Sequence, residues 1–303
     1  LVAESWGYNN LSKNDVVLLT DMEHHSNIIP WQMICKKTGA KIKYLKSSSD
    51  GTIVVDKFNN AFDKNIKMVS ITHASNVFGT INPVKEFVNL AHKNGSKIML
   101  DGCQAIPHMK VSVEELGCDF YAFSGHKMLG PTGVGVLYGK EELLDKMEPY
   151  QTGGGIIKTV TMENSSWTSI PHKFEPGTPM IAQVIALSPA ADYLENCLES
   201  HDNKLMEYAI EKMNSINGIS IYGDAKDRTP ILSFNIEGVH SLDLAHFLDF
   251  EGITIRSGHH CCQPLMQALD ISACARASFY FYNTFSEVEF LVEKINKAIQ
   301  VIK

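Results

Sequence analysis

Two residues of opposite charge, Asp101 and Lys127, each close a short apolar run of the chain. Asp101 follows residues 97–100 (KIML), and Lys127 follows residues 120–123 (FYAF) and a short polar turn. A carboxylate and an amine at the ends of neighbouring strands are what a pyridoxal phosphate (PLP) site requires. The carboxylate keeps the pyridine nitrogen protonated, and the amine forms a Schiff base with the aldehyde. A lone charged residue at a strand end is usually only solvated, but the small and hydroxyl residues before Lys127 would suit a phosphate.

The segment MEHHSN at residues 22–27 follows a predicted strand and opens a predicted helix. The simplest interpretation is a polar loop in which Ser26 or Asn27 caps the helix. A functional interpretation places the His24 imidazole flat on a cofactor ring, where it can pass protons. Metal binding is the least favoured alternative, because adjacent histidines on extended backbone point to opposite sides.

A second polar segment, residues 256–262 (RSGHHCC), contains adjacent thiols. An arbitrary cysteine is usually an inert, buried group. Two histidines and an arginine nearby favour the nucleophilic thiolate at Cys261, and Gly258 would let the loop bend sharply. Zinc binding through His260 and Cys261 is a weaker alternative, because no second Cys/His pair occurs at ligand spacing.

Arg276 lies among small residues in the segment CARAS. An exposed arginine is the default, but small apolar neighbours suggest partial burial and a carboxylate partner, which the planar guanidinium grips in two places. The glycine-rich loops at residues 153–155 and 177–179 are weak signals by themselves, because ordinary turns explain most such loops.

The bulk properties exclude several classes of protein. The net charge of −7 and the lack of a Lys/Arg cluster argue against a nucleic-acid partner. No apolar run reaches the roughly 18 residues that suggest a membrane span. Seven scattered cysteines without a CxxC pair favour free thiols in a reducing compartment.

Strand and helix signals alternate over the first two-thirds of the chain, which predicts an α/β fold with a mostly parallel sheet covered on both faces. Predicted strands occupy residues 15–20, 41–45, 67–72, 97–100, 120–123 and 134–138, and predicted helices occupy residues 26–37, 56–62 and 83–94. Ligands of such sheets bind beyond the carboxyl ends of the strands. That edge would carry His24, Asn76, Asp101, Gln104 and Lys127.

The remaining third has a different texture, typical of a smaller α+β domain. A long helix at residues 181–198 leads into helices at 205–214, 241–251 and 286–302, and into strands at 219–222, 231–236, 253–256 and 275–280. We therefore predict a PLP-binding large domain at residues 1–190 and a small domain at residues 191–303 that carries the cysteine loop.

Together these segments resemble the fold-type I PLP enzymes called class V aminotransferases, and within them the group II (SufS-type) cysteine desulfurases. The resemblance runs over essentially the whole chain. The matching motifs are MEHHSN at 22–27, THASNVFGTINP at 72–83, DGCQAIPH at 101–108, FSGHKMLGPTGVGVLYG at 123–139, FEPGTP at 174–179, RSGHHC at 256–261 and ARAS at 275–278.

The resemblance implies a set of cofactor residues. Lys127 would form the Schiff base, Asp101 would pair with the pyridinium nitrogen, and Gln104 would lie near the phenolic oxygen. His24 would stack on the ring. The phosphate would be held by Ser124, His126 and, across a homodimer, Thr178.

The resemblance also implies a substrate site and a reaction. Asn76 and Arg276 would bind the α-carboxylate of L-cysteine, and Cys261 would take its sulfur as a persulfide, leaving L-alanine. The sulfur would pass to an acceptor protein of the Suf type for Fe–S cluster assembly, in a cytoplasm or an organelle such as a plastid. The alternatives are a selenocysteine lyase, another class V reaction such as transamination or kynureninase-type cleavage, or a non-catalytic sulfur-relay or zinc-binding module.

Two departures from the family pattern stand out. Cys262 occupies a position where a small residue is common, so a second thiol could capture the persulfide or be inert. The N-terminal phosphate-binding segment, with its Gly-Thr pair, has no counterpart here. We therefore expect an N-terminally truncated chain that binds PLP weakly as printed.

Overall fold

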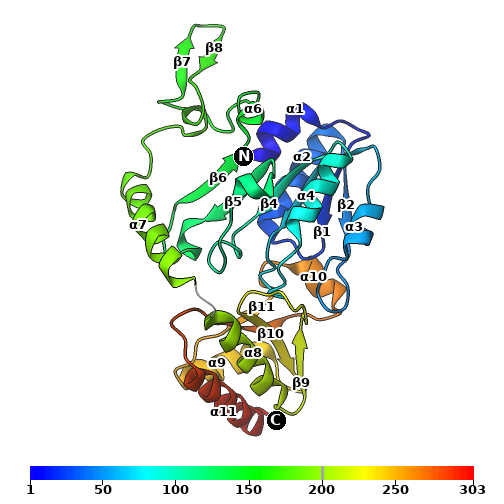
Figure 1. Ribbon diagram of the computed structural model, residues 1–303, viewed down its shortest axis with the longest axis vertical. Coiled ribbons are helices and arrows are strands. Elements are labelled where there is room, and N and C mark those ends of the chain that lie inside the picture. The colour runs from blue at the N-terminus through cyan, green and yellow to red at the C-terminus, as the bar shows by residue number, and fades with distance from the viewer. Residues whose placement is uncertain (199–200) are drawn as a thin grey trace.

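The computed structural model describes residues 1–198 and 201–303. Two separate sheets dominate it, and a two-stranded hairpin projects from one end (Figure 1). The larger sheet and its helices come from the first half of the chain, whereas the smaller sheet comes from the last third. None of the described helices combines the length and the apolar character that crossing a bilayer requires.

The larger sheet has the order β2-β1-β3-β4-β5-β6. Its strands are β1 (Val16–Thr20), β2 (Lys41–Leu45), β3 (Ile66–Thr72), β4 (Lys97–Asp101), β5 (Phe120–Ser124) and β6 (Gly135–Gly139). The first five are parallel, and β6 pairs with β5 in the antiparallel direction. The predicted mostly parallel sheet is therefore confirmed.

Helices cover both faces of this sheet. Successive residues of a strand point to opposite sides, so each strand contributes side chains to a core on either face. Leu18 of β1 belongs to a core that includes Phe58 of α3 (Val55–Asn60) and Phe87 of α4 (Val84–Lys93). Its neighbours Val17 and Leu19 belong to a second core with Trp31 of α2 (Ile29–Thr38). Shorter helical segments complete this part: Ala3–Gly7, α1 (Tyr8–Asn10), His25–Asn27, α5 (Val113–Leu116), Gly125–Lys127 and α6 (Glu141–Leu144).

The smaller sheet is antiparallel, with the order β11-β12-β10-β9. Its strands are β9 (Ile219–Tyr222), β10 (Ile231–Ile236), β11 (Arg256–Gly258) and β12 (Cys274–Ser278). The helices α8 (His201–Asn214), α9 (Ser241–Phe250) and α11 (Phe285–Ile302) accompany it, and α9 and α11 bury apolar residues in a third core. The helix α10 (Gln263–Ala268) differs, since Leu265 and Met266 lie in the core of the larger sheet.

Between the two parts, the chain forms the hairpin β7 (Ile157–Val160) and β8 (Ser165–Trp167), a short turn at His172–Phe174 and the long helix α7 (Ile181–Cys197). Figure 1 shows the hairpin standing away from the rest of the chain and α7 running down one side. Most of α7 is exposed, and Leu194 is its buried residue.

Several elements differ from those predicted. The predicted strand at residues 253–256 is wrong for its first three residues, because pairing with β12 begins only at Arg256. Ile253 instead donates its amide to Leu248 and closes the end of α9, where Gly252 has a φ of 82°. The helix predicted at residues 26–37 begins later in the structure, at Ile29, because a separate helical turn at His25–Asn27 precedes α2. The hairpin and α10 were not predicted.

Candidate active site

The expected residues gather where the parallel strands end. His24 follows β1, Asn76 follows β3, Asp101 is the last residue of β4, and Lys127 follows β5. Strands β4 and β5 are direct neighbours, with Asp101 paired in register to Ala122. The prediction that Asp101 and Lys127 end neighbouring strands is therefore confirmed.

His24, Asp101 and Lys127 form one electrostatic group. The pKa of His24 is lowered, first by partial burial and then by the Lys127 cation, while Asp101 acts in the opposite direction. The His24 Nδ1 atom accepts the Ser26 amide at 3.1 Å, so the cap of this turn is His24 and not Ser26 or Asn27. The lowered pKa favours the neutral imidazole, and because Nδ1 accepts the Ser26 amide, the proton of that form lies on Nε2.

The other residues expected to hold the cofactor differ in their contacts and in their exposure to solvent. Asp101 accepts the Cys103 amide on Oδ1 at 3.0 Å. Gln104 is half-buried in the following turn, and the Ser124 hydroxyl lies 3.6 Å from the Cys103 sulfur. His126 and Thr178 are both exposed, and Thr178 lies in the loop before α7.

A buried carboxyl group, Glu23, lies beneath this site and was not singled out from the sequence. It accepts the Thr20 hydroxyl at 2.6 Å, the Asn27 side-chain amide at 2.7 Å and the backbone amide of Thr72 at 3.1 Å. These bonds tie the ends of β1 and β3 together. Burial, with a smaller contribution from the nearby Asp101 charge, raises the pKa of Glu23 to about 8 although these hydrogen bonds act in the opposite direction. The sequence signal that could have revealed Glu23 was an acidic residue close to the end of an apolar strand, β1.

We expect Glu23→Gln to remove a pH dependence of stability. The pKa of Glu23 in the folded chain, about 8, exceeds its ordinary value of 4.5. The folded state therefore holds more protons between these values, and stability falls as the pH rises from about 4.5 to about 8, by at most about 1.4 kcal/mol per pH unit. Thermal unfolding across this range should show a shallower fall for Glu23→Gln than for the wild type. The exposed Glu86→Gln variant should keep the wild-type slope, and parallel curves for all three proteins would contradict the prediction.

The cysteine loop comes from the smaller sheet and reaches the same edge. His25 donates its amide to the Cys261 carbonyl at 2.8 Å, and Gln263 donates its amide to His25 Nε2 at 3.0 Å. The Asn76 side-chain amide donates to the His260 carbonyl at 2.7 Å. Cys261 is half-buried, whereas Cys262 is fully buried. These contacts place the Cys261 loop beside the turn that carries His24.

Two arginines lie next to the loop. Arg256 and Arg276 are paired in register across β11 and β12. Arg276 donates Nη1 to the Asn76 carbonyl at 2.8 Å, and its buried Nε atom has no partner. Among residues 1–198 and 201–303, no carboxylate forms an ion pair with Arg276. Adjacent cations with an unpaired donor suit an anionic ligand.

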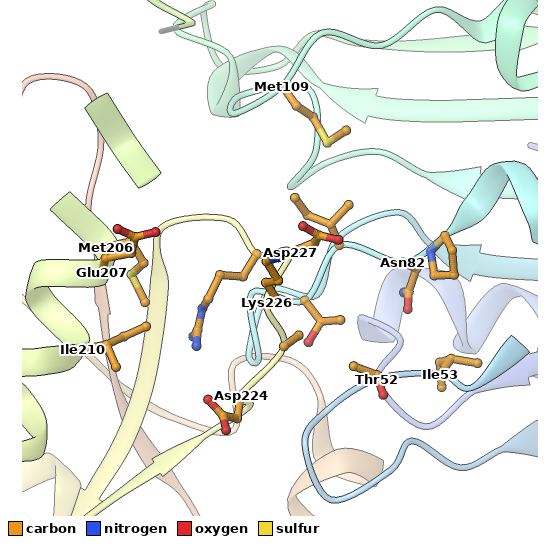
Figure 2. A pocket seen from close by; sticks show the side chains of 15 residues that line it. Thr52, Ile53, Asn82, Met109, Met206, Glu207, Ile210, Asp224, Lys226 and Asp227 are labelled. Atoms are coloured by element: carbon orange, nitrogen blue, oxygen red, sulfur yellow. The ribbon is translucent and has the colours of Figure 1, made fainter. Parts of the chain in front are cut away.

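A cavity lies away from these residues. It has a volume of about 1100 Å³ and lies between the two parts of the chain, lined by residues such as Thr52, Asn82, Glu207 and Lys226 (Figure 2). Neither Lys127 nor Cys261 lines it. Within residues 1–198 and 201–303, no group of three or more His, Cys, Asp or Glu side chains could hold a metal ion.

Comparison with known proteins gives the family. The sequence matches the family described as Aminotransferase class-V over residues 1–291. This chain belongs to the class V aminotransferase family. The cofactor expected from the sequence is confirmed at the level of the family, because class V aminotransferases of this kind are PLP-dependent.

Relatives within the class V family are named as desulfurases. A probable cysteine desulfurase of Halalkalibacterium halodurans is 50% identical over 98% of this chain and 74% of its own length. A cysteine desulfurase of Haloferax volcanii is 46% identical over 98% of this chain and 71% of its own length. The crystal structure of a cysteine desulfurase from Escherichia coli superposes with a TM-score of 0.95 at 34% identity, over 100% of this chain and 76% of that one. The predicted fold-type I architecture is thereby confirmed.

The residues at the strand edge fit PLP. Asp101 ends β4 with a carboxylate that can accept a ring N–H, and the His24 imidazole interacts electrostatically with both Asp101 and Lys127. Lys127 is half-buried and directly follows β5, where an amine can bond to an aldehyde carbon. The imidazole of His24, the carboxylate of Asp101 and the amine of Lys127 thus lie at the same edge of the sheet, and these are the groups that this cofactor requires.

Proposed function

We propose that this protein is a PLP-dependent cysteine desulfurase that converts L-cysteine to L-alanine and transfers the sulfur to Cys261. The proposal rests mainly on one observation, the placement of the Cys261 loop against the His24 turn through the bond from the His25 amide to the Cys261 carbonyl. A thiol beside a PLP lysine suits transfer of sulfur, whereas transamination needs no such nucleophile. The named relatives support the same activity.

The cofactor would be held by residues of the strand edge. Lys127 would bond to the aldehyde, Asp101 would face the ring nitrogen, and Gln104 would face the phenolic oxygen. Ser124 and His126 would contact the phosphate, and His24 would lie on the ring. When bound, PLP supplies an electron sink for the pair released at the substrate α-carbon.

The side chains of this protein would then carry out the remaining steps. The Lys127 amine accepts the α-proton, and the Cys261 thiolate attacks the substrate sulfur. The carbon–sulfur bond breaks and its electron pair stays with the β-carbon, and protonation of that carbon together with return of the α-proton from Lys127 gives alanine. His24 is placed to donate a proton, because its Nδ1 atom accepts the Ser26 amide and the neutral imidazole therefore carries its proton on Nε2. Cys261 retains the sulfur as a persulfide.

Arg276 would bind the substrate carboxylate, together with Asn76. We expect Arg276→Lys to raise the KM for L-cysteine by about tenfold to a hundredfold, because an ammonium cannot grip a carboxylate in two places. The KM for cysteamine, which lacks the carboxylate, should change far less. Steady-state kinetics with both compounds measures this, and equal losses for the two would show that Arg276 acts in another way.

We propose a homodimer in which Thr178 reaches the phosphate of the other subunit. Support comes from the apolar surface of α7, where Ile181, Val184 and Ile185 are 56%, 52% and 69% exposed. Exposed apolar patches of this kind mark interaction sites. We expect Ile185→Glu to yield a monomer in light scattering after size-exclusion chromatography, whereas Lys93→Glu on the exposed end of α4 stays dimeric. A wild type that is monomeric at micromolar concentration would rule the homodimer out.

Finer aspects of the proposal rest on the sequence motifs. The short Cys261 loop favours the group II type, and we propose an acceptor protein of Fe–S cluster assembly and a cytoplasmic or plastid location. We also propose that residues 1–190 bind PLP and that residues 191–303 form the small domain, since each sheet has its own core. Selenocysteine lyase activity is the second candidate, favoured by the same Cys261 and Arg276 site.

The decisive experiment measures alanine and sulfane sulfur from L-cysteine with saturating PLP. Equal amounts of both products are expected. Pyruvate with ammonia, or kynurenine cleavage without desulfuration, would assign the protein to another class V reaction.

A further inference from the structure

Cys262, the thiol that departs from the family pattern, lies in a closed hydrogen-bond arrangement. Its side chain is 0% exposed, and its Sγ atom donates to Asn76 Oδ1 at 3.0 Å. The Asn76 Nδ2 atom donates to the His260 carbonyl at 2.7 Å. Because that carbonyl can only accept, the amide nitrogen must face it and the amide oxygen must face the thiol. The orientation of Asn76 is therefore determined by two groups of the cysteine loop.

The loop needs such anchors. His260 and Cys261 have φ values of 52° and 57°, in the left-handed region that side chains rarely adopt. Two consecutive residues in this region persist only where neighbouring contacts hold them. Further bonds to the loop include the His25 amide to the Cys261 carbonyl and His260 Nε2 with the Cys274 carbonyl, separated by 3.0 Å. The bond from Cys262 to Asn76 adds a side-chain anchor at the position that departs from the family pattern.

The thiol is suited to donate and unsuited to receive sulfur. Burial, with the nearby Glu23 carboxyl, raises the pKa of Cys262 to about 12, so the proton stays on sulfur at physiological pH. A protonated, inaccessible thiol is a poor nucleophile. Asn76 also accepts Arg276 Nη1 on its backbone carbonyl at 2.8 Å. A shift of Asn76 would therefore displace both the loop and the arginine.

We propose that Cys262 is a positioning residue, whose thiol fixes the Asn76 amide and thereby holds the Cys261 loop and Arg276 in place. The expected effect on the KM for L-cysteine depends on the proposed function, whereas the positioning of the loop does not. Removal of the thiol leaves a buried amide oxygen without a donor, whereas a serine hydroxyl can replace the donor.

The test compares Cys262→Ala, Cys262→Ser and the control Cys35→Ala, which removes a buried thiol from α2. Amide hydrogen exchange of a peptide covering residues 256–266 should be about fivefold faster in Cys262→Ala. It should be at the wild-type rate in Cys262→Ser and Cys35→Ala. The KM for L-cysteine should rise by about fivefold to tenfold in Cys262→Ala and return in Cys262→Ser. In an Asn76→Ala background, Cys262→Ala should add little to either effect, because the two residues act through one bond.

Several results would overturn the proposal. Unchanged exchange and KM in Cys262→Ala would do so, as would persulfide sulfur mapped to Cys262 by mass spectrometry after turnover. If Cys262→Ala does not fold, a folded Cys262→Ser with fast exchange and a raised KM contradicts it, and wild-type values support it. A wild type that forms no alanine would refute the proposed function alone, since the exchange comparison needs no turnover.

Discussion

Cys261→Ala should abolish desulfuration of L-cysteine while PLP stays bound. The variant removes the sulfur nucleophile but leaves Lys127, Asp101 and His24 unchanged, and nucleophile removal commonly lowers turnover by about a thousandfold or more. Alanine and sulfane sulfur should fall together, and the visible absorption of the bound cofactor should match that of the wild type. Cys261→Ser is a stricter version, because a hydroxyl keeps the size of the side chain but is a weak nucleophile at its ordinary pKa.

The same variant separates the two candidate substrates. A selenocysteine lyase that releases selenium without an enzyme nucleophile would keep its activity toward L-selenocysteine after Cys261→Ala. Cysteine turnover that survives in this variant, with PLP bound, would refute the persulfide mechanism. Cys103→Ala is the matched control, since it removes another half-buried free thiol, one that contacts Ser124 and lies outside the Cys261 loop.

Lys127→Ala should eliminate both turnover and covalent attachment of PLP. The residue supplies the amine that bonds to the aldehyde and the group that accepts the α-proton, so both functions disappear with one side chain. We expect a loss of activity of about a thousandfold or more, with no PLP adduct on the peptide after borohydride reduction. The wild type should give that adduct at Lys127.

Controls for Lys127 use its neighbours. Lys140→Ala removes a lysine at the opposite end of the sheet, where the side chain contacts Asp119 at 3.2 Å. This variant should keep the adduct and the turnover. A reduced adduct at any lysine other than Lys127 would refute the assignment, and a wild type without any adduct would favour the non-catalytic sulfur-relay alternative.

The sequence allowed the strand edge to be predicted because its signals are local. Apolar runs that end in Asp101 and before Lys127 define two strands, and parallel strands bring their carboxyl ends together. Local signals gave a wrong prediction where the start of a strand depends on backbone pairing with a neighbouring strand. Residues 253–255 are apolar enough for a strand, yet the ladder of β11 begins only at Arg256.

Tertiary contacts explain what could not be predicted. The bond between Cys262 and Asn76 joins residues that are 186 positions apart, and nothing near either residue indicates the other. The cap of the turn after β1 could not be predicted either. Ser26 is the residue type expected to cap a helix, but in the structure the His24 ring accepts the Ser26 amide. Glu23 was interpreted as part of a polar loop, whereas donors from two strands and one from the turn at His25–Asn27 enclose it.

The placement of α10 bears on how this chain folds. Leu265 and Met266 come from the part of the chain that builds the smaller sheet, yet they fill the core around Leu18 and Phe87. The first 198 residues alone would leave that core incomplete, with apolar surface open to water. The two sheets therefore cannot reach their native state as independent units, and denaturant should unfold them in one cooperative transition.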